Sequence, residues 1–151
     1  MQDSMIQVQV DVAAPIHVVW DAWTLPEHIV QWNMASDDWH CPRASNEVKV
    51  GGRLSATMAA RDGSMEFDFG GTYTEVEVGT RLVFVMDDQR RVELDFSTTD
   101  RGVTIVERFD SDGQYPVELQ QQGWQAILDN FKIHAERISH SEDGSYGTVG
   151  C

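Results

Sequence analysis

Residues 122–139, QGWQAILDNFKIHAERIS, decide the fold. Their apolar side chains recur at intervals of three and four, which is the pattern of an α-helix with one buried face. This stripe consists of Trp124, Ile127, Leu128, Phe131, Ala135 and Ile138. Because Pro116 suits the first turn of a helix, we predict a helix over residues 116–139. At about 1.5 Å per residue it would be roughly 36 Å long, enough to cross a whole sheet.

Short runs of alternating apolar and polar residues precede this helix. An apolar residue at every second position is typical of a strand with one buried face, and turn formers such as Asp62-Gly63 separate the runs. Strands are predicted near residues 6–12, 54–58, 67–78, 82–86, 92–96 and 103–109. All but the first would form an antiparallel meander. Gly70-Gly71 predicts a bulge or sharp bend in the longest strand, so the sheet should be curved.

Two short helices follow the first strand. Pro15 and Pro26 each begin a segment with apolar residues at helical spacing, which predicts helices over residues 15–24 and 26–32. Residues 33–46 show neither period and predict a long loop with one short strand at most. This order is not a βαβ alternation, so it favours an α+β fold in which a curved antiparallel sheet wraps around the long C-terminal helix.

The charge balance restricts the possible partners. Eleven Lys and Arg residues stand against 25 Asp and Glu residues, for a net charge of −14 at pH 7. The resulting field repels phosphate backbones and anionic lipid surfaces, so we expect neither nucleic acid nor a membrane as a partner. The N-terminal residues lack the regions of a secretory signal, and the two cysteines, Cys41 and Cys151, do not form a disulfide framework. A cytoplasmic protein is predicted.

The chain length suits a single domain. With 151 residues, one hydrophobic core suffices for stability. We predict that residues 1–139 form this domain. Residues 140–151 are polar, rich in glycine and without periodicity, so they are predicted to form a flexible tail.

Several motifs in a fixed order carry a resemblance to a known family. They include PEHIVQW from Pro26, DDWHCP from Asp37, DGSMEFDFGGTYTEV from Asp62 and QGWQAILDNFK from Gln122. In this order they closely resemble the Aha-type branch of the START-like (SRPBCC) helix-grip superfamily, which is named after an activator of the heat-shock-protein-90 ATPase. The resemblance runs from about Ile6 to about Glu136. It implies a β-α-α-β(6)-α fold and leaves the function open, because similar proteins include cyclases, lipid carriers and chaperone cofactors.

Bulky side chains on the predicted strands and helices would converge on one interior. We predict that they line a ligand cavity between the sheet and the C-terminal helix: Trp32, Trp39, His40, Met58, Phe67, Phe69, Tyr73, Phe84, Met86, Phe96, Trp124 and Leu128. The alternative for any one of them is ordinary core packing. Gly123 interrupts the helix at a cost of roughly 1 kcal/mol relative to alanine, so it suggests that a strand or a ligand approaches the helix closely.

No residue pattern identifies a catalytic or metal site. His40 and Cys41 are adjacent on an extended segment and would point to opposite faces, so they cannot form a nucleophile–base pair with each other. The other histidines lack ligand spacing, and no nucleotide motif is present, so no metal or cofactor is expected. Asp68 and Glu107 are expected to turn outward into solvent.

Three functions are compatible with these observations. The first is a binding or carrier protein for a small apolar molecule, with His40 or Tyr73 as an orienting polar group. The second is a cyclase or hydrolase type of enzyme in the same cavity, which would require an inward-facing acid or base with a shifted pKa. The third is a protein-interaction module, namely a chaperone cofactor or a homodimer. We expect the first and consider catalysis the less favoured.

Overall fold

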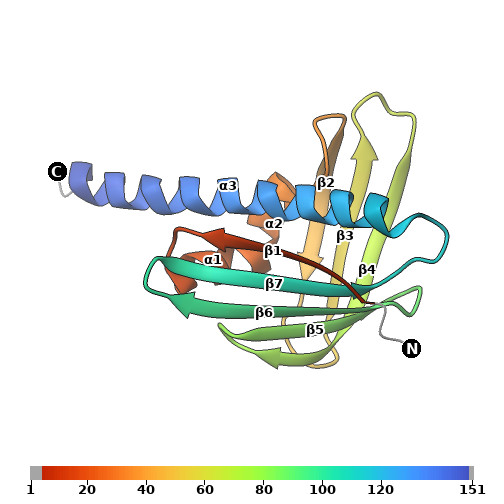
Figure 1. The fold of residues 1–151 in the computed structure, drawn as a ribbon. Helices are drawn as coiled ribbons and strands as arrows, with labels where there is room; N and C mark the ends of the chain where they lie inside the picture. The colour runs from red at the N-terminus through yellow and green to blue at the C-terminus, as the bar shows by residue number, and fades with distance from the viewer. Residues whose placement is uncertain (1–4, 150–151) are drawn as a thin grey trace.

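The computed structural model describes the backbone of residues 5–149 and the side chains of residues 5–140. One strand, β1, and two short helices, α1 and α2, precede six further strands and the long helix α3 (Figure 1). The elements are β1 (Met5–Val12), α1 (Ile16–Thr24), α2 (Pro26–Trp32), β2 (Trp39–Asn46), β3 (Arg53–Ala60), β4 (Glu66–Glu77), β5 (Arg81–Met86), β6 (Arg91–Thr99), β7 (Gly102–Asp110) and α3 (Val117–Val149). This order confirms the predicted β-α-α-β(6)-α arrangement.

The seven strands form one antiparallel sheet in the order β1-β7-β6-β5-β4-β3-β2. The sheet is strongly curved, so that β2, β3 and β4 rise steeply relative to β5, β6 and β7, and α3 crosses its concave side (Figure 1). The predicted α+β helix-grip fold is therefore confirmed. No helix within residues 5–149 is long and apolar enough to span a bilayer.

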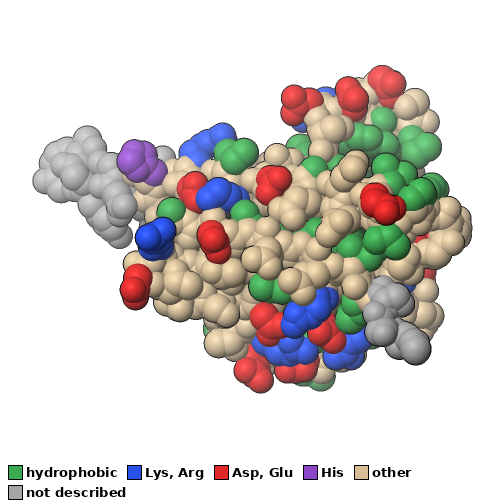
Figure 2. Space-filling view, viewed as in Figure 1, with side chains coloured by type: hydrophobic (Ala, Val, Ile, Leu, Met, Phe, Trp, Pro, Cys, Tyr) green, Lys and Arg blue, Asp and Glu red, His purple; other side chains and the backbone are tan. Residues whose placement is uncertain are grey.

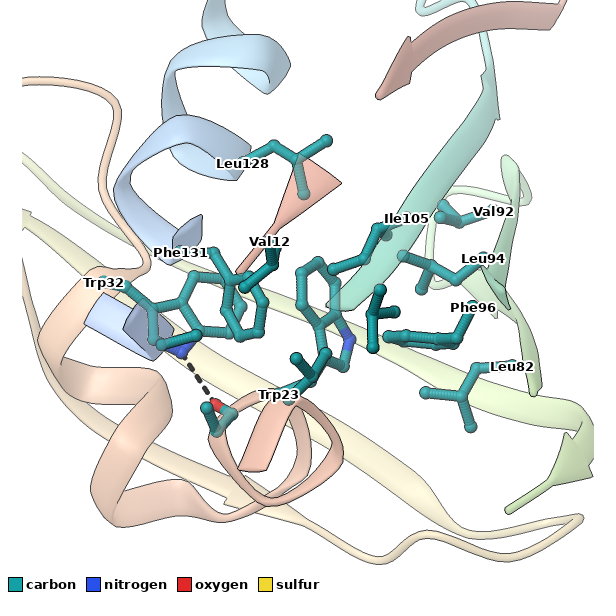
Figure 3. Close-up of a cluster of buried hydrophobic side chains, with 14 of the residues drawn as sticks. Val12, Trp23, Trp32, Leu82, Val92, Leu94, Phe96, Ile105, Leu128 and Phe131 are labelled. Carbon is teal, nitrogen blue, oxygen red and sulfur yellow. Dashed lines mark hydrogen bonds between the residues drawn. The ribbon is translucent and has the colours of Figure 1, made fainter. Parts of the chain in front are cut away.

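The concave side of the sheet and α3 enclose an aromatic core. Leu128 and Phe131 descend from α3 and are fully buried, and Phe131 contacts both Trp23 and Trp32 edge-to-face, at ring-centroid distances of 4.9 and 5.1 Å (Figure 3). Trp32 donates a hydrogen bond from its indole nitrogen to the carbonyl of Ala22, at 2.8 Å. Burial of such large side chains contributes most of the stability of a domain, so α1 and α2 complete the core beside α3.

Side chains of α3 cover the outer edge of β1. Gln121 and Gln125 donate hydrogen bonds from their side-chain amides to the carbonyls of Gln7 and Gln9, at 3.0 and 3.1 Å. About two turns further along, Lys132 donates to the carbonyl of Asp11, at 2.6 Å. An edge strand normally leaves such groups unpaired within its sheet. The helix therefore satisfies backbone groups that no neighbouring strand reaches.

The convex side of β5, β6 and β7 carries paired charges. Arg81 forms ion pairs with Glu75 and Asp95, at 3.0 and 2.9 Å, and Arg108 approaches the same Asp95 at 3.5 Å. Figure 2 shows basic and acidic side chains gathered below the helix, where this part of the sheet lies. The outward residues of these strands thus form an interlinked charged surface, while their neighbours in the sequence form the core.

Three details of the fold differ from the sequence prediction. Residues 39–46 form the eight-residue strand β2, where a long loop with one short strand at most was predicted. The register of β2 against β3 shifts between His40 and Arg43, and this irregularity hides the period of two. The bulge in β4 lies between Tyr73 and Glu75 and not at Gly70-Gly71. The helix α3 continues beyond Ser139 to Val149; the flexibility expected of residues 140–151 stays a prediction, and residues 150–151 lie outside the described residues.

Candidate functional site: a pocket between the sheet and the long helix

A pocket of about 240 Å³ lies between the concave side of the sheet and the helices. Strands β3, β4 and β5, with one residue each from β2 and β7, form one wall, and α1, α2 and α3 form the other. Most of the lining is apolar. The lining residues are Trp23, Ile29, Trp32, Asn33, Asn46, Leu54, Met58, Phe67, Phe69, Tyr73, Phe84, Met86, Arg90, Glu107, Trp124 and Ile127.

Many of the side chains proposed from the sequence meet at this pocket. They are Trp32, Met58, Phe67, Phe69, Tyr73, Phe84, Met86 and Trp124. Phe96 and Leu128 are instead buried in the aromatic core. Trp39 and His40 are half-buried at the start of β2, where Trp39 contacts the half-exposed Phe67 at a ring-centroid distance of 5.7 Å. These last four residues of the predicted set therefore do not line the pocket.

Residues that the sequence analysis did not propose complete the lining. Leu54 and Ile127 belong to the same apolar patterns as their neighbours Met58 and Trp124, so the alternation and the helical stripe were signals for them. Asn46 and Arg90 come from the end of β2 and from the turn before β6. No local pattern marks these two, because only the folding of the sheet brings them to the pocket.

A hydrogen-bonded chain fixes the polar end of the pocket. The Tyr73 hydroxyl donates to Asn46 Oδ1 at 2.7 Å, and Asn46 Nδ2 donates to the carbonyl of Thr24 at 2.8 Å. Tyr73 is buried, and this burial raises the pKa of its hydroxyl to about 12. Tyr73 therefore stays protonated at neutral pH. The chain ties β4, β2 and α1 together and holds two polar side chains in place at the pocket wall.

Glu107 faces the pocket, which corrects the expectation that it turns outward into solvent. It lies on β7 between Ile105 and Phe109, and all three side chains are buried on the concave side. Only 7% of Glu107 is exposed. Burial raises the pKa of its carboxyl from the usual 4.5 to about 8, so the group is mostly protonated at neutral pH. The expectation was wrong because it placed Glu107 on the outward face of its strand, whereas the alternation of β7 puts it on the same face as Ile105 and Phe109.

The other acid and the histidine–cysteine pair lie away from the pocket lining. Asp68 is exposed and accepts a hydrogen bond from the Thr57 hydroxyl at 2.8 Å, as expected for an outward-facing residue. Cys41 is buried in a small cluster with Ala56 and Met58, and burial raises the pKa of its thiol. A thiol in such surroundings is a poor nucleophile. Cys151 lies outside the described residues.

The surroundings of Gly123 differ from the expectation. A Cβ atom built at this position would meet no atom within 4 Å, and the residue is not part of the pocket lining. The close approach inferred from the sequence is therefore absent at this glycine. Trp124 beside it stacks on Phe109, with ring centroids 3.8 Å apart and an interplanar angle of 10°.

Two histidines that are distant in the sequence meet between α2 and α3. His28 Nδ1 lies 2.9 Å from His134 Nε2, so one ring donates and the other accepts a hydrogen bond. Burial and the neighbouring His28 and Arg137 lower the pKa of His134 to about 4. No spacing in the sequence predicts this pair, because its members belong to helices that only the fold brings together.

Comparison with known proteins identifies the relatives of this chain. The family model described as activator of Hsp90 ATPase homolog 1-like protein matches residues 13–136. A solution structure of the AHSA1-like protein from Aeromonas hydrophila is 45% identical, covers 89% of this chain and 93% of its own, and superposes with a TM-score of 0.84. A comparison with functionally curated proteins finds no match.

Two further solved structures show the same fold. A protein from Cytophaga hutchinsonii is 47% identical and has a TM-score of 0.77, with 88% of this chain and 92% of that chain covered. A protein from Chromobacterium violaceum has a TM-score of 0.79 at 20% identity, with 88% and 98% covered, and this likeness concerns the fold alone. The match of the family model over most of the chain is decisive: the chain belongs to the activator of Hsp90 ATPase homolog 1-like family.

Proposed function

We propose that the protein binds or carries a small apolar molecule in the pocket between the sheet and α3. The observation that carries this proposal is the pocket itself, whose wall is formed mainly by aromatic, aliphatic and methionine side chains. Such side chains supply contact area for an apolar ligand, while a few polar groups orient it. Tyr73 and Asn46 are suited to that second role, because their hydrogen bonds to each other fix their positions.

The rim of the pocket also favours entry of an apolar molecule. Phe67 lines the pocket and is 50% exposed, and Met65, two residues earlier in the chain, is 57% exposed. Figure 2 shows hydrophobic side chains gathered over the end of the molecule where β3 and β4 meet and α3 begins. A large exposed apolar side chain at a pocket mouth offers a first contact for a ligand that leaves water.

The test is to fill the pocket and measure ligand uptake. The variant Ile127→Trp places a bulkier side chain at the pocket wall, and Ile133→Trp places the same side chain on the exposed part of the same helix. The probe is N-phenyl-1-naphthylamine, an uncharged dye that fluoresces in apolar surroundings. We expect the wild type and Ile133→Trp to bind it in equal stoichiometry and Ile127→Trp to lose binding.

Native mass spectrometry of the protein purified from cells provides a second measurement. A co-purified apolar molecule that is absent from Ile127→Trp would support the proposal and identify the chemical class of the ligand. Thermal unfolding of both variants controls for folding. If Ile127→Trp folds and binds the dye as well as the wild type does, the pocket is not the binding site, and a protein partner becomes the favoured explanation.

Glu107 supports a second candidate, an enzyme of cyclase or hydrolase type. A carboxyl with a pKa of about 8 inside a pocket has the property expected of a general acid at neutral pH. The variant Glu107→Gln keeps the shape and removes the acid. An enzyme would lose turnover of the co-purified molecule while still binding it, whereas a carrier would show no turnover in either form.

A further inference from the structure

The carboxyl of Glu107 has apolar neighbours on all the strands around it. In the sheet it pairs with Val8 of β1 on one side and with Leu94 of β6 on the other, and all of these side chains are buried. Its neighbours on the same face of β7 are Ile105 and Phe109. The group is therefore largely removed from solvent among strand neighbours that are all hydrocarbon, since only 7% of it is exposed.

The other titratable groups of the pocket already have partners. Arg90 donates to Asp88 at 2.8 Å and lies 3.9 Å from a carboxylate oxygen of Asp112. Tyr73 donates to Asn46. Apart from Glu107, Arg90 and Tyr73 are the titratable residues among those that line the pocket. Among the described residues, no hydrogen bond or ion pair to the Glu107 carboxyl accompanies its burial, and desolvation is the sole cause of its shifted pKa. No fully enclosed side-chain oxygen of these residues lacks a partner, so the Glu107 oxygens keep a small exposure, which lies at the pocket wall.

A carboxyl that is mostly removed from water and has no protein partner is costly to the protein. Such a group loses most of its hydration with no hydrogen bond to replace it, and the loss is greater when the group is charged. A strand position facing an apolar wall would be filled more favourably by valine or isoleucine, as at positions 103 and 105. The cost is offset when a ligand supplies the missing hydrogen-bonding group, so the chemistry of the ligand must complement a carboxyl.

We propose that the ligand of this pocket is a mainly apolar molecule that carries a basic nitrogen, which pairs with the Glu107 carboxyl. This inference rests on the proposed binding function. An acid and a base form a pair with no net charge wherever the proton lies, so the pocket never has to bury an isolated charge. The net charge of −14 also attracts a protonated amine from solution.

Other ligand groups complement the site less well. A carboxylic acid would place a second acidic group beside Glu107, and like charges disfavour each other strongly in an apolar environment. A carbonyl oxygen would accept a hydrogen bond only from the protonated form of Glu107, so its affinity would fall as the carboxyl ionises. A hydroxyl can accept from the protonated carboxyl and donate to the carboxylate, but it forms no ion pair. The basic nitrogen matches both proton states and adds the stronger, charge-assisted bond.

The test compares three probes that share one apolar body: naphthylethylamine, naphthylethanol and naphthylacetate. Binding to the full-length protein is measured by calorimetry from pH 6 to pH 9, with the wild type, Glu107→Gln and Glu77→Gln. Glu77 is exposed on β4, so its variant removes one charge without touching the pocket. We expect the wild type and Glu77→Gln to bind the amine about tenfold or more tightly than the alcohol and Glu107→Gln to lose this preference.

Proton release gives a readout that a merely structural role would not produce. Below pH 8 the carboxyl must ionise to pair with the ammonium group, so the wild type should release about one proton per bound amine. Its affinity for the amine should therefore rise with pH up to about 8, and the alcohol should show no such rise. Calorimetry in buffers of different ionisation enthalpy counts the protons, and Glu107→Gln should release none.

Three outcomes would overturn the inference. If the amine and the alcohol bind equally to the wild type and to Glu107→Gln, Glu107 does not select the ligand, although the pocket still binds apolar molecules. If affinity falls with rising pH or the acetate binds best, the ligand carries an acceptor or an acid and not a base. If none of the three probes binds, the inference fails, and uptake of the uncharged dye then decides separately whether the proposed function fails with it.

Discussion

The interior between the sheet and α3 has two parts that are built from the same layers and filled differently. In one part, Phe131 meets Trp23 and Trp32, and these two indoles stack at a ring-centroid distance of 4.8 Å. In the other part, Tyr73 and Glu107 border an open pocket. The difference follows from α1 and α2, whose tryptophans fill the first part and only border the second. We therefore expect the aromatic residues of the first part to contribute mainly to stability and the residues around the pocket to contribute mainly to binding.

The largest contrast should appear in the free energy of unfolding. Phe131→Ala leaves a closed cavity among aromatic rings and should cost about 3–5 kcal/mol. Met58→Ala at the pocket wall enlarges a space that already exists, so we expect a loss of only about 1–2 kcal/mol. Urea unfolding measures both. Equal losses would show that the pocket part is packed as tightly as the aromatic part.

The pocket carboxyl should give the next largest effect, through pH. The folded-state pKa of Glu107 is about 8, above its ordinary value of 4.5, so its stabilising protonated form is present at low pH and is lost as pH rises toward 8. Between pH 5.5 and pH 8 the wild type should lose about 2–3 kcal/mol relative to Glu107→Gln. Urea unfolding at both pH values tests this. A constant difference would mean that water reaches the carboxyl freely.

The His28–His134 pair between α2 and α3 should make stability depend on pH in the opposite direction. The pKa of His134 is lowered to about 4 from 6.5, so the neutral form is favoured by folding, and stability is lost as pH falls from about 6.5 toward 4. We expect a loss of about 2 kcal/mol between pH 7 and pH 4.5. This slope should disappear in His134→Gln and persist in His17→Gln, which alters an exposed histidine on α1.

The smallest expected effect is a gain in stability at Gly123, which belongs neither to the aromatic core nor to the pocket lining. A Cβ at Gly123 meets no atom within 4 Å, and alanine favours a helix over glycine by up to about 1 kcal/mol. Gly123→Ala should therefore raise the unfolding free energy by about 0.5–1 kcal/mol and leave dye binding unchanged. A loss of binding would show that the helix near Trp124 must deform to admit the ligand.

Much of the fold could be predicted from periodicity, because most strands and the long helix bury one face each. The prediction failed at β2, an edge strand whose register shift between His40 and Arg43 breaks the alternation. Edge strands tolerate such irregularity, since one side has no partner strand to match. The pattern was therefore weakest where the sheet constrains the sequence least.

The candidate site was predictable only in part. Its aromatic lining followed from alternation. The same alternation places Glu107 on the face of Val103, Ile105 and Phe109, but it was assigned to the opposite face. Asn46 and Arg90 reach the pocket through the curvature of the sheet, which no short sequence pattern encodes. Residues whose chemistry conflicts with their position in a pattern deserve more weight as site candidates, because a polar group in an apolar wall needs a reason.

The hydrogen bonds from α3 side chains to the edge of β1 also limit how two copies of this protein can associate. Gln121, Gln125 and Lys132 already take the carbonyls that an incoming strand would need. Addition of a foreign strand to that edge would first require the helix to lift away. A dimer built by joining two sheets, or an early step of aggregation, must therefore begin at β2 on the opposite edge.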